Sequence, residues 1–264
     1  MKAFIVDGYG PSATLRAGDR IGTYAELIAV DEGDLARTPV GLSMIEAASL
    51  PLVALTAWQA LVEKADVQPG QKVLVHAGSG GVGTIAIQLA KHLGAHVATT
   101  TSTANVGWVG ELGADEVIDY RTADFEQELR DYDVVLDSLG PENLTKSLRV
   151  LRPGGLAISI AGPPDPAFAT QLARPLLRPV LAVLSWKIRR AARKLGVHYS
   201  FLFMRSDGGQ LQQITALVEA GVIRPVVDRT FDFDDTPAAL DYVRSGRVKG
   251  KVVVTMTPVH ETRP

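Results

Sequence analysis

Three glycines lie at the spacing that lets a backbone cradle a phosphate: Gly78, Gly80 and Gly83. The apolar run 72–76 before them is typical of a buried parallel strand, and the residues after them have helical periodicity. In that context the first glycine permits a tight turn, the second admits a pyrophosphate, and the third allows the helix to pack closely on the strand. The sequence therefore predicts a dinucleotide site at the helix N-terminus, formed by Gly78, Ser79, Gly80, Gly81, Val82 and Gly83.

The neighbouring residues separate this motif from related ones. A P-loop would place a lysine after the last glycine, but Thr84 follows Gly83. NAD enzymes usually have an acidic residue at the end of the second strand, yet residues 84–110 contain no Asp or Glu. The strand ends in hydroxyl side chains, so we expect NADP(H) rather than NAD(H) or S-adenosylmethionine. Arg121 either supplies a cation for the 2′-phosphate or is a solvated strand-end charge, and the sequence leaves both open.

Composition narrows the class of protein. The 264 residues carry a formal net charge of −2, which gives no indication of a nucleic-acid partner. There is no cysteine, which excludes disulfides and cysteine-ligated zinc, and the five histidines lack metal-ligand spacing, so we expect no metal. The N-terminus does not resemble a signal peptide, and no apolar run is long enough to span a bilayer. We therefore expect a cytoplasmic protein without an integral membrane segment.

Strand and helix patterns alternate along the chain, which predicts a doubly wound parallel α/β sheet. A helix is expected to begin at Ser43, with Glu46 as its capping partner, and to be interrupted at Pro51. The expected strands are 3–6, 22–30, 72–76, 96–101, 116–120, 133–137, 156–161, 199–204, 226–233 and 251–256. The other expected helices are 55–64, 82–93, 144–151, 210–219 and 237–245, with one more ending at 112–114.

Residues 163–200 differ from the rest, because they are rich in Leu and Arg and include a basic helix at 187–194. One interpretation is a lid or packed helix with its charges in water, which could border an apolar substrate near Trp186. The other is a helix that lies on a membrane surface. Pro175 and Pro179 prevent one long amphipathic helix, which favours the lid.

Several motifs together point to a known family. They are LPLVALTAWQAL at 50–61, QPGQKVLV at 68–75, AGSGGVG at 77–83, LGA at 93–95, LGAD at 112–115, VIDY at 117–120, DVVLD at 133–137, LRPGG at 151–155 and GKVVV at 250–254. From Gly22 onward the chain resembles the zinc-independent medium-chain dehydrogenase/reductases, in particular the quinone oxidoreductase (zeta-crystallin-like) branch. The resemblance implies a Rossmann sheet beside a GroES-like β domain.

The resemblance also implies cofactor contacts. Thr100, Thr101 and Ser102 would face the adenosine ribose and its phosphate, with Tyr120 nearby, although the family's lysine after the second strand has no counterpart in 104–107. Thr56 matches a threonine near the nicotinamide, and it could equally be a helix-packing hydroxyl. The residues expected to border the nicotinamide and its ribose are Leu139, Gly140, Ala161, Gly162, Phe201, Leu202 and Phe203.

The front of the chain departs from the family pattern. Residues 1–11 resemble the family's opening strand and 22–30 resemble a strand near the end of its barrel, with only 12–21 between them. We therefore expect a reduced remnant of the GroES-like β domain, from residues 1–50 and 225–264, beside an NAD(P)-binding domain at 51–224.

The family reaction is hydride transfer from NADPH to a conjugated carbonyl, such as a quinone or an enone, without a metal. No catalytic acid is assigned, since Tyr24 and Tyr199 are better interpreted as structural. The alternative is a non-catalytic NADP(H)-binding remnant or a dimerisation module. A homodimer is expected, because the apolar strand 199–204 would be an uncovered sheet edge.

Overall fold

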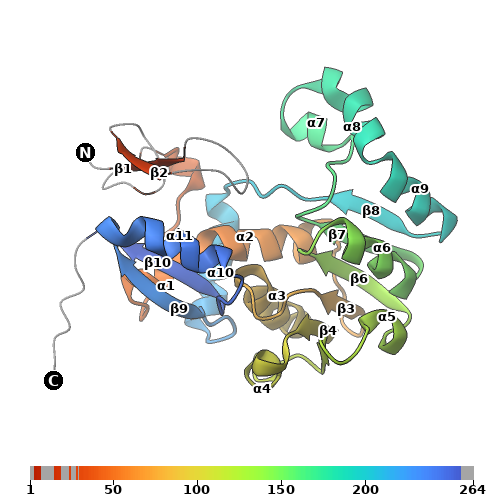
Figure 1. Ribbon diagram of the computed structural model, residues 1–264, viewed down its shortest axis with the longest axis horizontal. Coiled ribbons are helices and arrows are strands. Elements are labelled where there is room, and N and C mark those ends of the chain that lie inside the picture. The colour runs from red at the N-terminus through yellow and green to blue at the C-terminus, as the bar shows by residue number, and fades with distance from the viewer. Residues whose placement is uncertain (1–2, 7–14, 19–23, 25–27, 29, 257–264) are drawn as a thin grey trace.

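The computed structural model describes residues 3–6, 15–18, 24, 28 and 30–256. Its centre is a parallel sheet of six strands in the order β5-β4-β3-β6-β7-β8 (Figure 1). The chain builds from β3 toward β5 and then returns to add β6 to β8 on the other side, so β3 and β6 flank a switch point. This confirms the predicted doubly wound α/β fold. The strands are β3 (Lys72–Val75), β4 (His96–Thr101), β5 (Glu116–Asp119), β6 (Tyr132–Asp137), β7 (Leu151–Ser159) and β8 (His198–Phe201).

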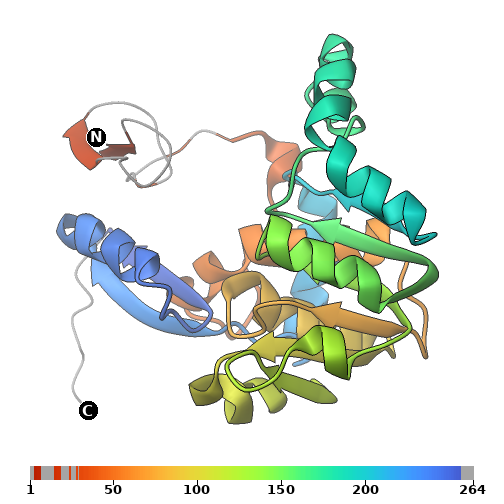
Figure 2. The same ribbon diagram turned by 45° about the vertical axis from the view of Figure 1, so that its right-hand side comes forward.

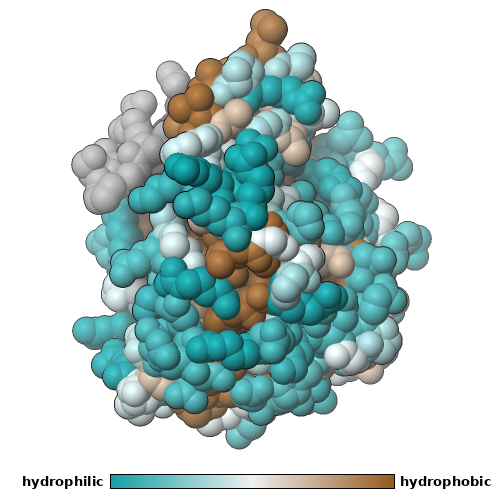
Figure 3. Space-filling model, turned by 90° about the vertical axis from the view of Figure 1, so that its right-hand side faces the viewer, coloured by the Kyte–Doolittle hydropathy of each residue, from teal (hydrophilic) through white to brown (hydrophobic). Residues whose placement is uncertain are grey.

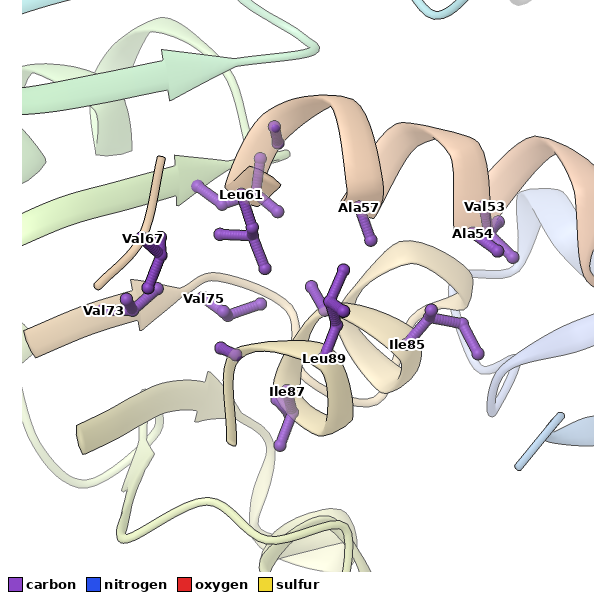
Figure 4. Packing of buried hydrophobic residues seen from close by; sticks show 14 of the residues in the cluster. Val53, Ala54, Ala57, Leu61, Val67, Val73, Val75, Ile85, Ile87 and Leu89 are labelled. Atoms are coloured by element: carbon purple, nitrogen blue, oxygen red, sulfur yellow. The ribbon is translucent and has the colours of Figure 1, made fainter. Parts of the chain in front are cut away.

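Helices cover both faces of the sheet, because its strands are apolar on both sides. In β3, Val73 and Val75 pack into one hydrophobic cluster, and Leu74 between them packs into the other. Figure 4 shows the first cluster, in which Leu61 and Leu89 are fully buried between helices and sheet. On that face lie α2 (Pro51–Trp58), α3 (Gly81–His92), α4 (Val106–Gly110) and α10 (Gly208–Glu219), and on the other α5 (Phe125–Glu128), α6 (Pro141–Val150) and α9 (Trp186–Lys194).

Some element boundaries differ from the prediction. Ser43 caps α1 (Met44–Ser49) through the expected capping box with Glu46, and α2 begins directly at Pro51 and continues as a π-helix over Gln59–Lys64. Proline is accommodated at a first helical position because no intrahelical N–H bond is needed there. Strand β7 begins at Leu151 rather than 156, because a register irregularity in β6 between Tyr132 and Val134 accommodates the turn-forming residues.

The chain ends form two further small sheets. β1 (Ala3–Val6) pairs antiparallel with β2 (Leu15–Gly18), a strand that the sequence did not predict. The strand expected over 22–30 falls mostly outside the described residues, and Tyr24, Ile28 and Val30 are not in a strand. β9 (Val227–Asp232) and β10 (Lys251–Thr255) form a parallel pair linked by α11 (Thr236–Arg244), and α1 contacts both strands. The division into a β remnant and a cofactor domain stays a prediction.

Between β7 and β8 the chain forms a projecting arm. Figures 1 and 2 show α7 (Phe168–Gln171) and α8 (Arg178–Leu184) standing away from the sheet, while α9 returns to it. A 3-10 turn at Pro175–Leu177 joins α7 to α8. The two prolines therefore begin short helical segments, as expected from their effect on one long helix.

Candidate cofactor site

The glycine loop follows β3 at the switch point, and two of its glycines are required by close contacts. A Cβ on Gly83 would lie 2.2 Å from the carbonyl oxygen of Ala77, and one on Gly78 would lie 2.2 Å from Thr99 Oγ1. Both distances are far below van der Waals contact. Ala77 itself has a φ of 52°, which marks the tight turn between strand and helix. The loop can therefore close onto α3 only with glycine at both positions.

The N-terminus of α3 has the geometry of an anion site. Its first intrahelical hydrogen bond is donated by the Thr84 N–H to the Gly80 carbonyl, over 3.0 Å. The N–H groups of Val82 and Gly83 therefore have no acceptor within the helix, and the first turn contains no acidic residue. These donors without intrahelical acceptors and the helix dipole favour a phosphate at this position.

The C-terminal β pair contributes a second wall that the sequence analysis missed. The Gly250 N–H donates to the Ser79 carbonyl over 2.8 Å, and Gly250 forms a parallel bridge with Gly80. Next to it, Lys251 lies so close to the loop that a Cβ on Gly81 would be 2.9 Å from the lysine Cδ. Burial lowers the pKa of Lys251, and within the described ranges its ammonium group makes no ion pair. The sequence signal for this contact was the GKVVV motif at 250–254, which supported the family resemblance but was not assigned to the cofactor site.

The threonines that end β4 lie deeper than expected. Thr100 is 2% exposed, and its Oγ1 lies 3.0 Å from Nδ1 of the buried His76. Thr101 is 1% exposed, and its Oγ1 is buried without a hydrogen-bond partner in the part of the chain that the structure describes. Ser102 is half-buried. An orphaned hydroxyl at the strand end fits an additional polar group beside it.

Strand β5 brings charged side chains to the same edge. Thr101 pairs with Asp119 in the sheet register, and the exposed Tyr120 donates its N–H to the Thr101 carbonyl over 3.1 Å. Hydrogen bonds from Thr103 and from the Arg121 N–H lower the pKa of Asp119. A carboxylate and a guanidinium thus accompany the predicted hydroxyls. Sequence reasoning missed Asp119 because it joins this edge only through strand pairing.

A buried carboxylate orders the turn after β6. Asp137 accepts hydrogen bonds from Ser159 Oγ at 2.6 Å and from the Leu139 N–H at 3.2 Å. Burial raises the pKa of Asp137. The turn continues through Gly140, whose φ of 94° suits glycine, and a Cβ there would lie 3.7 Å from the Ala161 carbonyl oxygen. The structure therefore brings the predicted pair 139–140 next to 161.

The last predicted segment, Phe201 to Phe203, lies beside the end of β7. The Leu202 N–H donates to the Ser159 carbonyl over 2.9 Å, and Leu202 is buried. The ring of Phe168 in α7 contacts the rings of Phe201 and Phe203, with centroids 5.2 and 5.5 Å apart. Gly162 is also close, because its Cβ would lie 2.8 Å from Ser159 Oγ. These predicted residues thus form one cluster at the carboxyl edge.

Two other predicted hydroxyls make structural hydrogen bonds. Thr56 is buried and donates to the Leu52 carbonyl one turn earlier in α2, over 2.7 Å. Tyr199 donates to the Pro163 carbonyl over 2.6 Å, and burial raises its pKa. These bonds match the packing interpretation of each side chain, and a cofactor role for Thr56 stays a prediction.

Other candidate sites are few. Within the described ranges, no group of three or more His, Cys, Asp and Glu side chains could hold a metal ion, and no helix is long and apolar enough to cross a membrane. Independence of zinc stays a prediction. Two surface hollows, one lined by α1 and α10 and one by α3, α4 and residues 221–224, include no residue of the glycine loop.

Comparison with known protein sequences matches the chain to dehydrogenases and reductases. A profile of the zinc-binding dehydrogenase family matches residues 112–254, over half of the chain. The NAD(P)H oxidoreductase RTN4IP1, mitochondrial, of Danio rerio is 36% identical over 245 residues, which cover 89% of this chain and 63% of that protein. The 2-methylene-furan-3-one reductase of Solanum lycopersicum is 35% identical over 90% of this chain and 54% of its own length.

Comparison with solved structures indicates the same family. The quinone oxidoreductase from Coxiella burnetii superimposes with a TM-score of 0.72 and 29% identity, over 84% of this chain and 63% of that one. The chain therefore spans 54–63% of the length of these three relatives. These matches confirm the resemblance identified in the motifs. The chain belongs to the zinc-binding dehydrogenase family of medium-chain dehydrogenase/reductases.

Proposed function

We propose that this chain binds NADP(H) at the glycine loop and reduces a conjugated carbonyl, such as a quinone or an enone. The observation that carries the proposal is the anion site at the start of α3, where the N–H groups of Val82 and Gly83 lack intrahelical acceptors. Lys251 adds a cation beside the same loop. The names of the relatives, an NAD(P)H oxidoreductase and a furanone reductase, support the reaction class.

Each part of the site has a proposed role. The glycine loop and Lys251 would hold the pyrophosphate, while Thr101, Ser102, Tyr120 and Arg121 would surround the adenosine ribose and its 2′-phosphate. The segments at 139–140 and 161–162 would border the nicotinamide ribose, and 201–203 would orient the ring. The bound cofactor supplies the hydride, and the protein supplies orientation and exclusion of water.

A second candidate is cofactor binding without turnover. It is favoured by Tyr199, whose hydroxyl donates to the Pro163 carbonyl over 2.6 Å and is therefore committed to a structural hydrogen bond rather than to proton delivery. In either case we propose a homodimer through the edge strand β8, and a cytoplasmic location.

Fluorescence titration with NADPH and NADH tests the binding step. We expect NADPH to bind more tightly, and the variant Lys251→Gln to weaken it by roughly 10- to 100-fold, because one charge-assisted hydrogen bond contributes about 1.5–3 kcal/mol. Lys249→Gln is the matched control, since that lysine is exposed two residues away. Equal loss in both variants would remove Lys251 from the site.

Turnover is tested separately, as NADPH oxidation with a panel of quinones and enones. Oxidation that depends on the acceptor supports the reductase, and tight binding without oxidation supports the second candidate. If the folded chain binds neither nucleotide, both candidates fail. If NADH binds as tightly as NADPH, the preference for the 2′-phosphate is wrong, and Asp119 becomes the expected partner of a ribose hydroxyl.

A further inference from the structure

The arm and the segment that anchors it differ in charge from the rest of the molecule. We call residues 166–204 the basic arm. It contains seven basic side chains and no Asp or Glu, whereas the whole chain has 27 Lys and Arg and 29 Asp and Glu. The remainder is therefore acidic, with 20 basic against 29 acidic residues. The basic side chains are Arg174, Arg178, Lys187, Arg189, Arg190, Arg193 and Lys194.

The same arm exposes large apolar side chains. Leu176, in the turn before α8, is 90% exposed, and Val183 in α8 is 76% exposed. Val180, Leu184 and Trp186 are each more than half exposed. Figure 3 shows hydrophobic side chains at the top of the molecule, where the arm stands, next to hydrophilic ones. Exposed apolar residues that occur together in this way indicate a contact surface rather than chance exposure.

Helical spacing brings the two kinds of side chain together. In α8, Val180, Val183 and Leu184 are three and four residues apart and share one face. In α9, which follows after Ser185, Trp186 and Arg190 share a face, and the Arg190 guanidinium lies 5.1 Å from the centre of the Trp186 ring. An apolar stripe thus leads directly into a basic one.

The opposite side of α9 anchors the arm. Ile188 and Ala192 are buried in the cluster that includes α6 and β7. α8 makes its main contacts with α7, the 3-10 turn and α9, which are all parts of the arm. The exposed stripe is therefore held on a fixed base and is not needed to cover the sheet.

We propose that the basic arm binds the surface of an anionic lipid bilayer, with Leu176, Val183 and Trp186 entering the interface and the basic side chains of α9 contacting the headgroups. A basic and apolar helix face of this kind lies in the plane of a membrane interface. A nucleic acid would leave the apolar side chains in water. A second copy of α8 and α9 would repel the first by its charge, because α9 carries five basic side chains and neither helix carries an acidic one. Leu176 and the exposed side chains of α8 and α9 include none of the proposed cofactor residues, so the proposal holds whether or not the chain turns over.

Vesicle flotation tests the charged half of the surface. We expect binding to phosphatidylcholine vesicles that contain about 30 mol% phosphatidylserine, little binding to phosphatidylcholine alone, and weakening by salt. The double variant Arg190→Glu, Arg193→Glu should lower the partition coefficient at least ~25-fold, because each basic residue near such a surface contributes a factor of about five. The matched control is Arg37→Glu, Arg247→Glu, which makes the same charge change at exposed positions outside the arm.

The apolar half has its own variant. Leu176→Ser, Val183→Ser keeps the charge and should lower vesicle binding several-fold while thermal stability is unchanged. Tryptophan emission should shift to the blue on binding, and Trp186→Phe should remove that shift, since Trp58 and Trp108 lie outside the arm. The proposal is overturned if the charge variants bind as the wild type does, if the serine variant binds fully and short duplex DNA competes, or if light scattering shows a dimer that the arm variants dissociate.

Discussion

Residue identity is determined by different causes in the glycine loop and in the basic arm. In the loop, Gly78 and Gly83 are fixed by backbone and side-chain atoms that leave no room for a Cβ. In the arm, Leu176 and Val183 touch little, so nothing in the fold specifies them. Residue identity in the loop is set by close packing around a backbone anion site. Residue identity in the arm is explained only by something outside the chain.

Gly83→Ala is expected to have the largest effect in the loop, because it should lower both the stability of the fold and the affinity for NADPH. Its Cβ would meet the Ala77 carbonyl oxygen at 2.2 Å, and a backbone atom cannot move aside cheaply. We expect the free energy of unfolding to fall on the order of 2–3 kcal/mol, and NADPH affinity to fall with it, because the loop must open. Urea denaturation followed by circular dichroism measures the first quantity, and the fluorescence titration measures the second.

Gly107→Ala is the matched control for that substitution. This glycine lies in α4, and a Cβ there would meet nothing within 4 Å. Alanine should leave stability unchanged or raise it by up to about 1 kcal/mol, since it favours helix. Equal destabilisation of both variants would mean that the close approach at Gly83 does not determine the residue.

The buried His76 gives the stability of the sheet region a pH dependence. Burial lowers its pKa to about 4, and its ring nitrogens lie 3.0 Å from Thr100 Oγ1 and 2.8 Å from Ser147 Oγ. A depressed histidine pKa means that the neutral form is the stable one in the fold. Its contribution is complete above about pH 6.5 and is lost as the pH falls toward about 4, roughly 3 kcal/mol in all.

Urea denaturation at several pH values between 7 and 5 checks this sign. The wild type should lose stability faster with falling pH than His76→Gln, whose amide can occupy the same hydrogen bonds without titrating. His92→Gln, at the exposed end of α3, is the control and should retain the wild-type slope. A slope that is unchanged in His76→Gln would show that other groups cause the acid sensitivity.

Sequence reasoning succeeded where the signal is local. The apolar period of 72–76, the glycines after it and the helical period that follows predicted β3, the loop and α3, since each depends on residues near in the chain. It failed where tertiary pairing makes the contact. Lys251 reaches Gly81 only because β10 docks on the loop, and Asp119 reaches Thr103 only through the pairing of β4 with β5.

The burial of individual hydroxyl side chains was also not predictable from the sequence pattern. The hydroxyls of β4 were expected to face the cofactor together, but successive residues of a strand point to opposite faces. Thr99 therefore donates to the Val75 carbonyl on one side, and Thr100 meets His76 on the other. Only the position of the strand inside the sheet decides which of these hydroxyls remains available.

The smallest expected effect is that of serine substitutions at the exposed arm residues on the free energy of unfolding. This effect tests most directly whether the fold determines residue identity in the arm as it does in the loop. Leu176→Ser and Val183→Ser should each change the free energy of unfolding by less than about 0.5 kcal/mol, because exposed side chains away from caps and close contacts contribute little to folding. Ile188→Ser, on the buried side of α9, is the contrast and should cost about 2 kcal/mol or more. Thermal denaturation in the absence of lipid measures all three.

If substitution of the exposed pair proves as costly as that of Ile188, the arm is packed against the body in solution. The lid that borders an apolar substrate then becomes the better interpretation, and Trp186→Phe should change acceptor preference rather than vesicle binding.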